Sequence, residues 1–157
     1  MSSELVSSSI LDHFERALTM FKEAASAFPD SEWKIGDTDY LRPAGVAYHV
    51  VESIRGYTGN IPFDKFNWGG RFNVDWETPD SEKLPSQQEL LEYLDEVRAD
   101  AEEWIKVNDL TQTEHLFVWT GKTLLSRMVY LLRHIQHHTA EMALELTKRG
   151  FKAPEWK

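Results

Sequence analysis

The sequence contains no cysteine. Disulfide bonds, cysteine-based zinc fingers, iron–sulfur clusters held by protein thiolates and a catalytic thiol belonging to the chain are therefore excluded. A metal ion, if one binds, must be held by His, Asp, Glu or water. The search for a functional site is thus narrowed to the histidines and the carboxylates.

Long hydrophobic runs and concentrated positive charge are also missing. No segment reaches the length of a membrane span, and the N-terminus lacks the basic start and continuous apolar run of a secretory signal. The 17 basic residues are dispersed among 26 acidic ones, giving a formal net charge of −9. This balance argues against a surface that follows nucleic-acid phosphates. We expect a cytoplasmic protein that binds neither membranes nor nucleic acid.

Apolar and aromatic residues, by contrast, are plentiful. Of the 157 residues, 41% are hydrophobic and 12% aromatic, including six tryptophans. This composition is that of a folded rather than a disordered chain. A chain of this length suits one compact core. We therefore expect a single domain over residues 1–157.

The spacing of the apolar residues predicts four helices. Apolar residues recur at helical intervals over residues 9–28, 43–57 and 123–149. A further helix should span residues 86–107, because Ser86-Gln-Gln-Glu89 matches a capping box at its start.

The connections between these segments are long. Residues 59–85 are rich in aromatics, so we expect them to pack over the helices rather than to be disordered. Residues 115–119 alternate weakly and could form a short strand or an extended linker. Four helices with such connections predict an all-α fold, an up-down four-helix bundle.

Three histidines form the most informative pattern. His134 and His138 lie one turn apart on the last predicted helix, and His49 lies at the centre of the second. Residues four apart project from the same helix face, so this pair can bind one ion while His49 supplies a third ligand from a facing helix. Such a pair also arises by chance, but the long amphipathic helix around it favours a shared site. Three imidazoles leave open coordination positions, as in catalytic metal sites.

The segment His134-Ile-Gln-His-His138-Thr-Ala-Glu141 resembles the C-terminal motif of the DinB/YfiT-like superfamily, His-x-x-x-His often followed by x-Gly-Gln. His49, within Ala-Tyr-His-Val-Val-Glu-Ser, falls where that family places its first metal histidine. The resemblance implies a metal-binding four-helix bundle, usually a homodimer, that holds zinc, nickel or a similar divalent ion with His49, His134 and His138. Characterised relatives include thiol S-transferases that use bacillithiol, mycothiol-dependent isomerases and hydrolase-like members.

Two glutamates are candidate catalytic residues. Glu141 stands where the family commonly has Gln, one turn beyond His138. It could orient a ligand, bind the metal directly or act as general base on a bound water, or it could be an exposed glutamate. Glu52, one turn after His49, could support an imidazole or a metal-bound water, or occupy a solvated position. His137 should point about 100° away from His138 and lie at the surface.

The aromatic residues of the connections allow two interpretations. Trp68, Trp76 and Trp119 could wall a pocket near the metal, but most tryptophans fill cores, and we favour the core interpretation.

Three functions are compatible with these features. The first is an enzyme whose divalent metal presents water or a thiolate to a small electrophilic substrate, with a low-molecular-weight thiol as cosubstrate in the transferase case. The second is a non-catalytic metal-binding homodimer with a structural or sensing role. The third, a diiron bundle, is disfavoured because the ferritin-like Glu-x-x-His order is reversed in His49-x-x-Glu52 and His138-x-x-Glu141.

Overall fold

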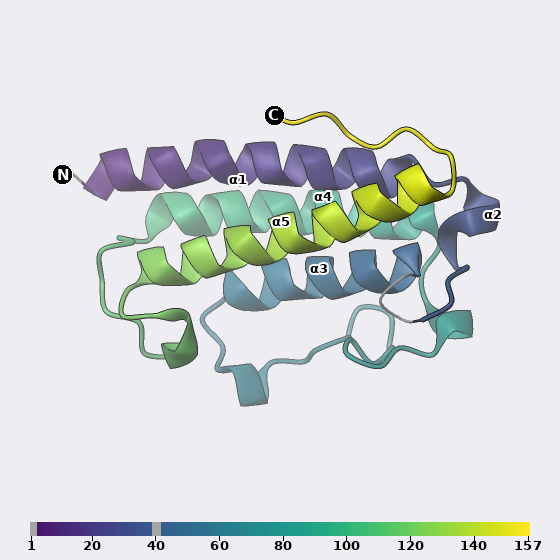
Figure 1. The fold of residues 1–157 in the computed structure, drawn as a ribbon. Coiled ribbons are helices and arrows are strands. Elements are labelled where there is room, and N and C mark those ends of the chain that lie inside the picture. The colour runs from purple at the N-terminus through teal and green to yellow at the C-terminus, as the bar shows by residue number, and fades with distance from the viewer. Residues whose placement is uncertain (1–2, 39–41) are drawn as a thin grey trace.

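Four long helices lie side by side in the computed structural model, which describes residues 3–38 and 42–157 (Figure 1). Within these ranges no β-strand occurs, and one isolated antiparallel bridge joins Thr113 to Thr123. The predicted all-α class is therefore confirmed. No helix in the described part of the chain is long and apolar enough to cross a membrane. The α-helices are α1 (Ser3–Ser26), α2 (Asp30–Trp33), α3 (Pro43–Tyr57), α4 (Gln87–Val107) and α5 (Leu124–Lys148).

Local sequence signals explain where these helices begin. The Ser86 hydroxyl accepts the Glu89 N–H and the Glu89 carboxylate accepts the Ser86 N–H, which completes the predicted capping box of α4. Pro43 occupies the first turn of α3, where its missing N–H costs nothing. Thr123 caps α5 through the Ser126 N–H. The bounds of α3 are those predicted, whereas α1 begins earlier than predicted.

Contacts between helices establish their relative directions. The Tyr93 hydroxyl of α4 donates a hydrogen bond to Glu52 of α3. The Trp104 indole, further along α4, donates to Asn60, which lies just after α3. These two helices therefore run in the same direction, opposite to α1 and α5 (Figure 1). The expected alternating up-down order is wrong between α3 and α4. The physical reason is the long connection, residues 58–86, which returns the chain to the end of the bundle where α3 began.

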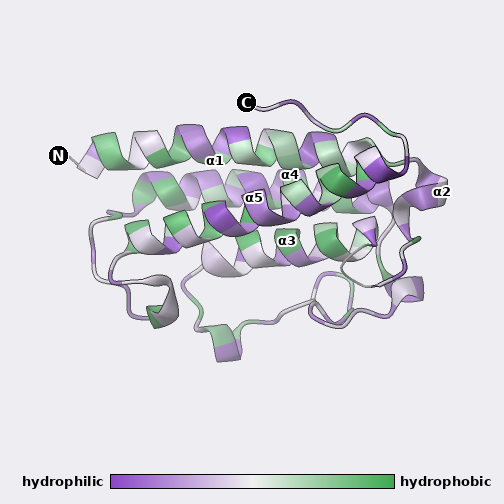
Figure 2. Cartoon of the chain, in the orientation of Figure 1, coloured by the Kyte–Doolittle hydropathy of each residue, from purple (hydrophilic) through white to green (hydrophobic). Residues whose placement is uncertain are grey.

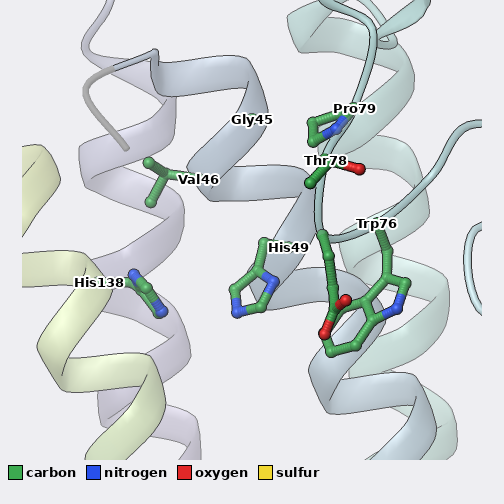
Figure 3. Close-up of a pocket in the computed structure, with 8 residues that line it drawn as sticks. Gly45, Val46, His49, Trp76, Thr78, Pro79 and His138 are labelled. Carbon is green, nitrogen blue, oxygen red and sulfur yellow. The ribbon is translucent and has the colours of Figure 1, made fainter. Parts of the chain in front are cut away.

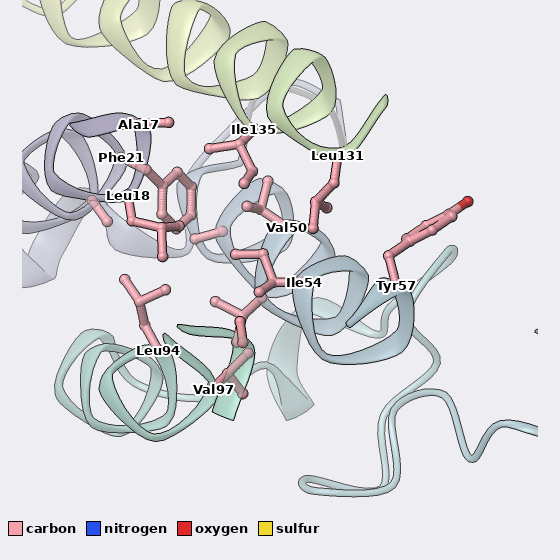
Figure 4. Close-up of a cluster of buried hydrophobic side chains, with 14 of the residues drawn as sticks. Ala17, Leu18, Phe21, Val50, Ile54, Tyr57, Leu94, Val97, Leu131 and Ile135 are labelled. Carbon is pink, nitrogen blue, oxygen red and sulfur yellow. The ribbon is translucent and has the colours of Figure 1, made fainter. Parts of the chain in front are cut away.

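The core lies between the four long helices. Phe14 and Phe21 of α1 and Ile54 of α3 are fully buried, and side chains from α4 and α5 close around them (Figure 4). Hydrophobic and hydrophilic residues alternate around the helices, as the amphipathic pattern requires (Figure 2). Burial of this apolar stripe stabilises the bundle and holds α3 and α5 at a fixed separation.

The connection between α3 and α4 packs along the bundle, as predicted. It contains two short 3₁₀ helices, η2 (Phe63–Lys65) and η3 (Ser81–Lys83). Its aromatic residues Phe63, Trp68 and Trp76 are partly buried against the core. Near α5, residues 115–119 form no strand in the described structure, and the 3₁₀ helix η4 (Val118–Thr120) overlaps them instead.

Candidate metal centre

Three imidazole rings converge between α3 and α5. His49 comes from α3, and His134 and His138 come from successive turns of α5. The Nε2 atom of His134 lies 3.1 Å from that of His49 and 3.2 Å from that of His138. The side chains of His49 and His138 point toward each other from α3 and α5, with their rings nearly perpendicular (Figure 3). The structure thus brings together all three of the histidines singled out in the sequence.

The spacing of these nitrogens fits a metal ion. Zinc–nitrogen bonds of about 2.0–2.1 Å, with angles between the octahedral 90° and the tetrahedral value of about 109°, separate two ligand nitrogens by roughly 2.8–3.4 Å. The observed 3.1 and 3.2 Å fall within this interval. The buried Nδ1 atom of His134 has no hydrogen-bond partner among the described residues. The three Nε2 atoms lie close enough together for one cation to bind all of them, whereas Nδ1 of His134, on the other side of the ring, would not contact that cation.

Burial keeps two of the rings neutral. Desolvation, reinforced by the neighbouring His138, lowers the pKa of His49 to about 4. Desolvation together with the neighbouring His138 and His49 lowers the pKa of His134 to about 3. Both imidazoles are therefore uncharged at neutral pH, which is the form that binds a metal ion.

Glu141 contacts the ring of His138 on the side away from the cluster. Its Oε2 atom lies 2.7 Å from Nδ1 of His138, and its Oε1 atom lies 3.2 Å from Nε2 of His137. A carboxylate beside Nδ1 keeps the proton on that nitrogen, so Nε2 of His138 presents a lone pair to the cluster. This is the contact expected of a glutamate that orients a metal ligand. The His137 side chain is 68% exposed, in agreement with the surface position predicted for it.

Trp76 stacks on the ring of His49. Its ring centroid lies 4.9 Å from that of His49 with an interplanar angle of 4°, and Trp68 stacks on Trp76 at 4.3 Å. The His49 ring also hydrogen-bonds the backbone of Trp76, which partly opposes the lowering of its pKa. Trp76 packs against the core and also lines the pocket described below, so the core interpretation alone does not describe it. Trp119 is 52% exposed and does not fill the core.

A pocket opens beside the cluster. It has a volume of about 490 Å³, and apolar surface dominates its walls. One carboxylate, that of Glu77, lines it, and no Lys or Arg does so in the described part of the chain. Of these walls the sequence indicated only Trp76, as one of two alternatives, because the walls come from the start of α3 and the distant long connection. The lining residues are Gly45, Val46, His49, Trp76, Glu77, Thr78, Pro79 and His138.

Glu52 lies elsewhere. The residue is fully buried, so the solvated position considered from the sequence is wrong. Its Oε2 atom accepts the Gly69 N–H at 2.7 Å, and its Oε1 atom accepts the Tyr93 hydroxyl at 2.6 Å. The structure therefore places this carboxylate between α3, α4 and the long connection, and does not bring it to the three imidazoles.

Comparison with known families gives one match. The family model of the DinB superfamily matches residues 13–142, a range that contains all three histidines. No curated protein matches the chain significantly.

Proposed function

The chain belongs to the DinB superfamily, and on this premise we propose that it is a metal-dependent enzyme acting on a small electrophilic molecule. The convergence of the Nε2 atoms of His49, His134 and His138 carries this proposal, because three imidazole nitrogens can bind a divalent ion and leave coordination positions open. Zinc and nickel are the ions best suited to such a site.

The three histidines would act as ligands only. A bound divalent ion supplies a lowered pKa for water, or a coordination position for an incoming thiolate. Glu141 would orient His138 through the contact with Nδ1, and the Trp76 ring would fix the plane of His49. The chain has no thiol of its own, so a transferase reaction requires a low-molecular-weight thiol as cosubstrate.

The pocket beside the cluster is the proposed substrate site. Its walls from Val46, Trp76 and Pro79 suit an apolar substrate body and would exclude water from it. Thr78 and Glu77 offer the remaining polar contacts. Glu77 is the one carboxylate among the described lining residues, and a divalent ion on the histidines would add positive charge, so the pocket suits a neutral substrate body with any anionic group, such as a thiolate, bound at the ion.

A non-catalytic role is the second candidate. The cluster joins α3 to α5, so a bound ion would cross-link two helices that are far apart in the sequence. In that case removing the metal would cost stability, whereas in an enzyme it would also abolish turnover. The homodimer implied by the family resemblance belongs to either proposal, and light scattering of the purified protein tests it.

Elemental analysis of the untagged purified protein tests the proposal. About one divalent ion per chain is expected, lost in His49→Ala and His138→Ala variants that remain folded by circular dichroism. His13→Ala is the matched control, because His13 is exposed on α1 and should leave the metal content unchanged. Screens for thiol transfer and hydrolysis then separate the catalytic from the structural role. A wild-type protein that holds no ion and takes up neither zinc nor nickel would contradict both.

A further inference from the structure

Glu52 is the one buried carboxylate of α3, and the proposed chemistry does not use it. Its oxygens accept hydrogen bonds from Gly69 in the long connection and from Tyr93 in α4, while Arg55 lies 3.6 Å away. We propose that Glu52 is a positioning residue that fixes the segment from Gly69 to Trp76, and thereby sets the indole that stacks on His49 and walls the substrate pocket.

The backbone next to Gly69 transmits this constraint. Gly69 O accepts the Val74 N–H at 3.3 Å, and the Tyr48 hydroxyl donates to Val74 O at 2.9 Å. Gly69 has a φ of +75°, and a Cβ atom there would lie 1.9 Å from Val74 O. Residue 69 must therefore be glycine for the loop to bring its backbone within hydrogen-bonding distance of Val74. Fixing the Gly69 amide consequently fixes Val74.

The same backbone contacts determine the positions of two indole rings. Trp76 lies two residues beyond Val74 and stacks on His49, and Trp68, directly before Gly69, stacks on Trp76. Trp68 in turn rests on Gly56 of α3, where a Cβ atom would lie 2.2 Å from its ring. The position of the two indoles thus depends on two contacts with α3: the Trp68 ring packs against Gly56, and the Gly69 N–H donates to Glu52.

Helix α3 therefore carries His49 and also positions Trp76, the indole that stacks on His49. Tyr48, Glu52 and Gly56 are spaced four apart on α3 and all contact the long connection, and His49 lies one turn before Glu52. A buried carboxylate with two good donors is a rigid anchor, because breaking either bond leaves a buried polar group unsatisfied. Specificity at the pocket then depends on a residue that does not touch it.

The test combines fluorine NMR with a metal titration. The protein is labelled with 5-fluorotryptophan, and the Trp76 signal is assigned with Trp76→Phe. In Glu52→Gln the Trp76 and Trp68 signals should shift or broaden, whereas that of Trp33, bonded to Pro85 O, should not. The affinity for Co²⁺, followed by its visible absorption, should fall roughly tenfold, as for other residues that orient a metal ligand indirectly. The NMR readout does not depend on the proposed function, which fails separately if the wild type binds no Co²⁺.

A second pair of variants guards against general destabilisation. Tyr93→Phe removes one donor to Glu52 and should shift the Trp76 signal in the same direction but less. Tyr57→Phe removes a buried hydroxyl of α3 that bonds Trp119, and should move the Trp119 signal while leaving that of Trp76 in place. An unchanged Trp76 signal in both Glu52→Gln and Tyr93→Phe, or an equal change in Tyr57→Phe, overturns the proposal.

Discussion

Two buried polar clusters lie between α3 and α5, and they differ in how completely their atoms are paired. In the first, Arg127 forms a two-pronged ion pair with Glu114, and donates to the backbone carbonyls of Tyr57 and Gly59. Glu114 also accepts the backbone N–H of Phe117. The Glu114 carboxylate thus accepts hydrogen bonds from a guanidinium and from the backbone. Burial alone would raise its pKa, but these hydrogen bonds lower it.

The histidine cluster is built in the opposite way. The Nε2 atoms of His49, His134 and His138 point at one another, and Nδ1 of His134 has no partner in the described part of the chain. Three ring nitrogens placed this close stabilise one another little unless a cation lies among them. The contrast suggests that the arginine cluster serves stability and the histidine cluster serves a ligand.

The largest effect on stability is expected at the arginine cluster. Arg127→Met leaves the Glu114 carboxylate buried and unpaired, so the free energy of unfolding should fall by about 3–5 kcal/mol. Urea denaturation of the metal-free protein measures this. The control is Arg16→Met, which removes an exposed pair with Asp12 and should leave the free energy of unfolding nearly unchanged. Equal losses in the two variants would contradict the assignment of a structural role to Arg127.

The next effect appears only when metal is present. Zinc at about one hundred times its dissociation constant should raise the free energy of unfolding of the wild type by roughly 2.7 kcal/mol. His134→Ala should abolish this gain and leave the metal-free protein as stable as the wild type or slightly more so, because an unpaired buried nitrogen is removed. Denaturation with and without zinc tests both parts. A metal-free variant that is strongly destabilised would show that the histidines are themselves structural.

A smaller effect is expected from Glu141. Glu141→Ala should weaken metal binding about tenfold, because the His138 ring loses its orienting acceptor. Glu141→Gln keeps an acceptor and should retain most of the affinity, so a loss of turnover in this variant with metal still bound would indicate a general base instead. Isothermal titration calorimetry measures the affinities, with Glu155→Gln, exposed in the C-terminal segment, as the unaffected reference.

The most gradual change should come from pH. The folded-state pKa values of His49 and His134, about 4 and about 3, lie below the ordinary 6.5 of an unfolded histidine. As pH falls from 6.5 toward 4, the unfolded chain takes up protons that the folded one does not, so the stability of the metal-free protein declines. Urea midpoints across this range should show the decline in the wild type and a shallower one in His134→Ala. A flat profile in the wild type would contradict the buried, neutral rings.

Residues close in sequence were the predictable part of this molecule. The bounds of α3, the capping box of α4 and the shared face of His134 and His138 all follow from local spacing, which a helix converts directly into geometry. The direction of α4 did not follow, because it depends on how the long connection crosses the bundle. The four-residue helix α2 was missed, since it is too short to show a period.

The candidate site divides in the same way. The three histidines that converge could be singled out from the sequence because they have recognisable metal-binding chemistry at a recognisable spacing. Trp76 could not be placed, because its contact with His49 spans a loop whose path is fixed by Gly69 and Glu52. The burial of Glu52 was hidden for the same reason: helical periodicity identifies a face but does not say which distant segment covers it.

The indole of Trp76 stacked on His49 also provides an intrinsic fluorescence signal for metal binding. Copper and nickel ions quench tryptophan emission at short range, and Trp76 lies 4.9 Å, centroid to centroid, from a proposed ligand with Trp68 directly behind it. Loading the site with either ion should therefore dim the intrinsic fluorescence of the protein in proportion to occupancy. Affinity could then be measured by titration in a cuvette, with no label and no knowledge of the substrate.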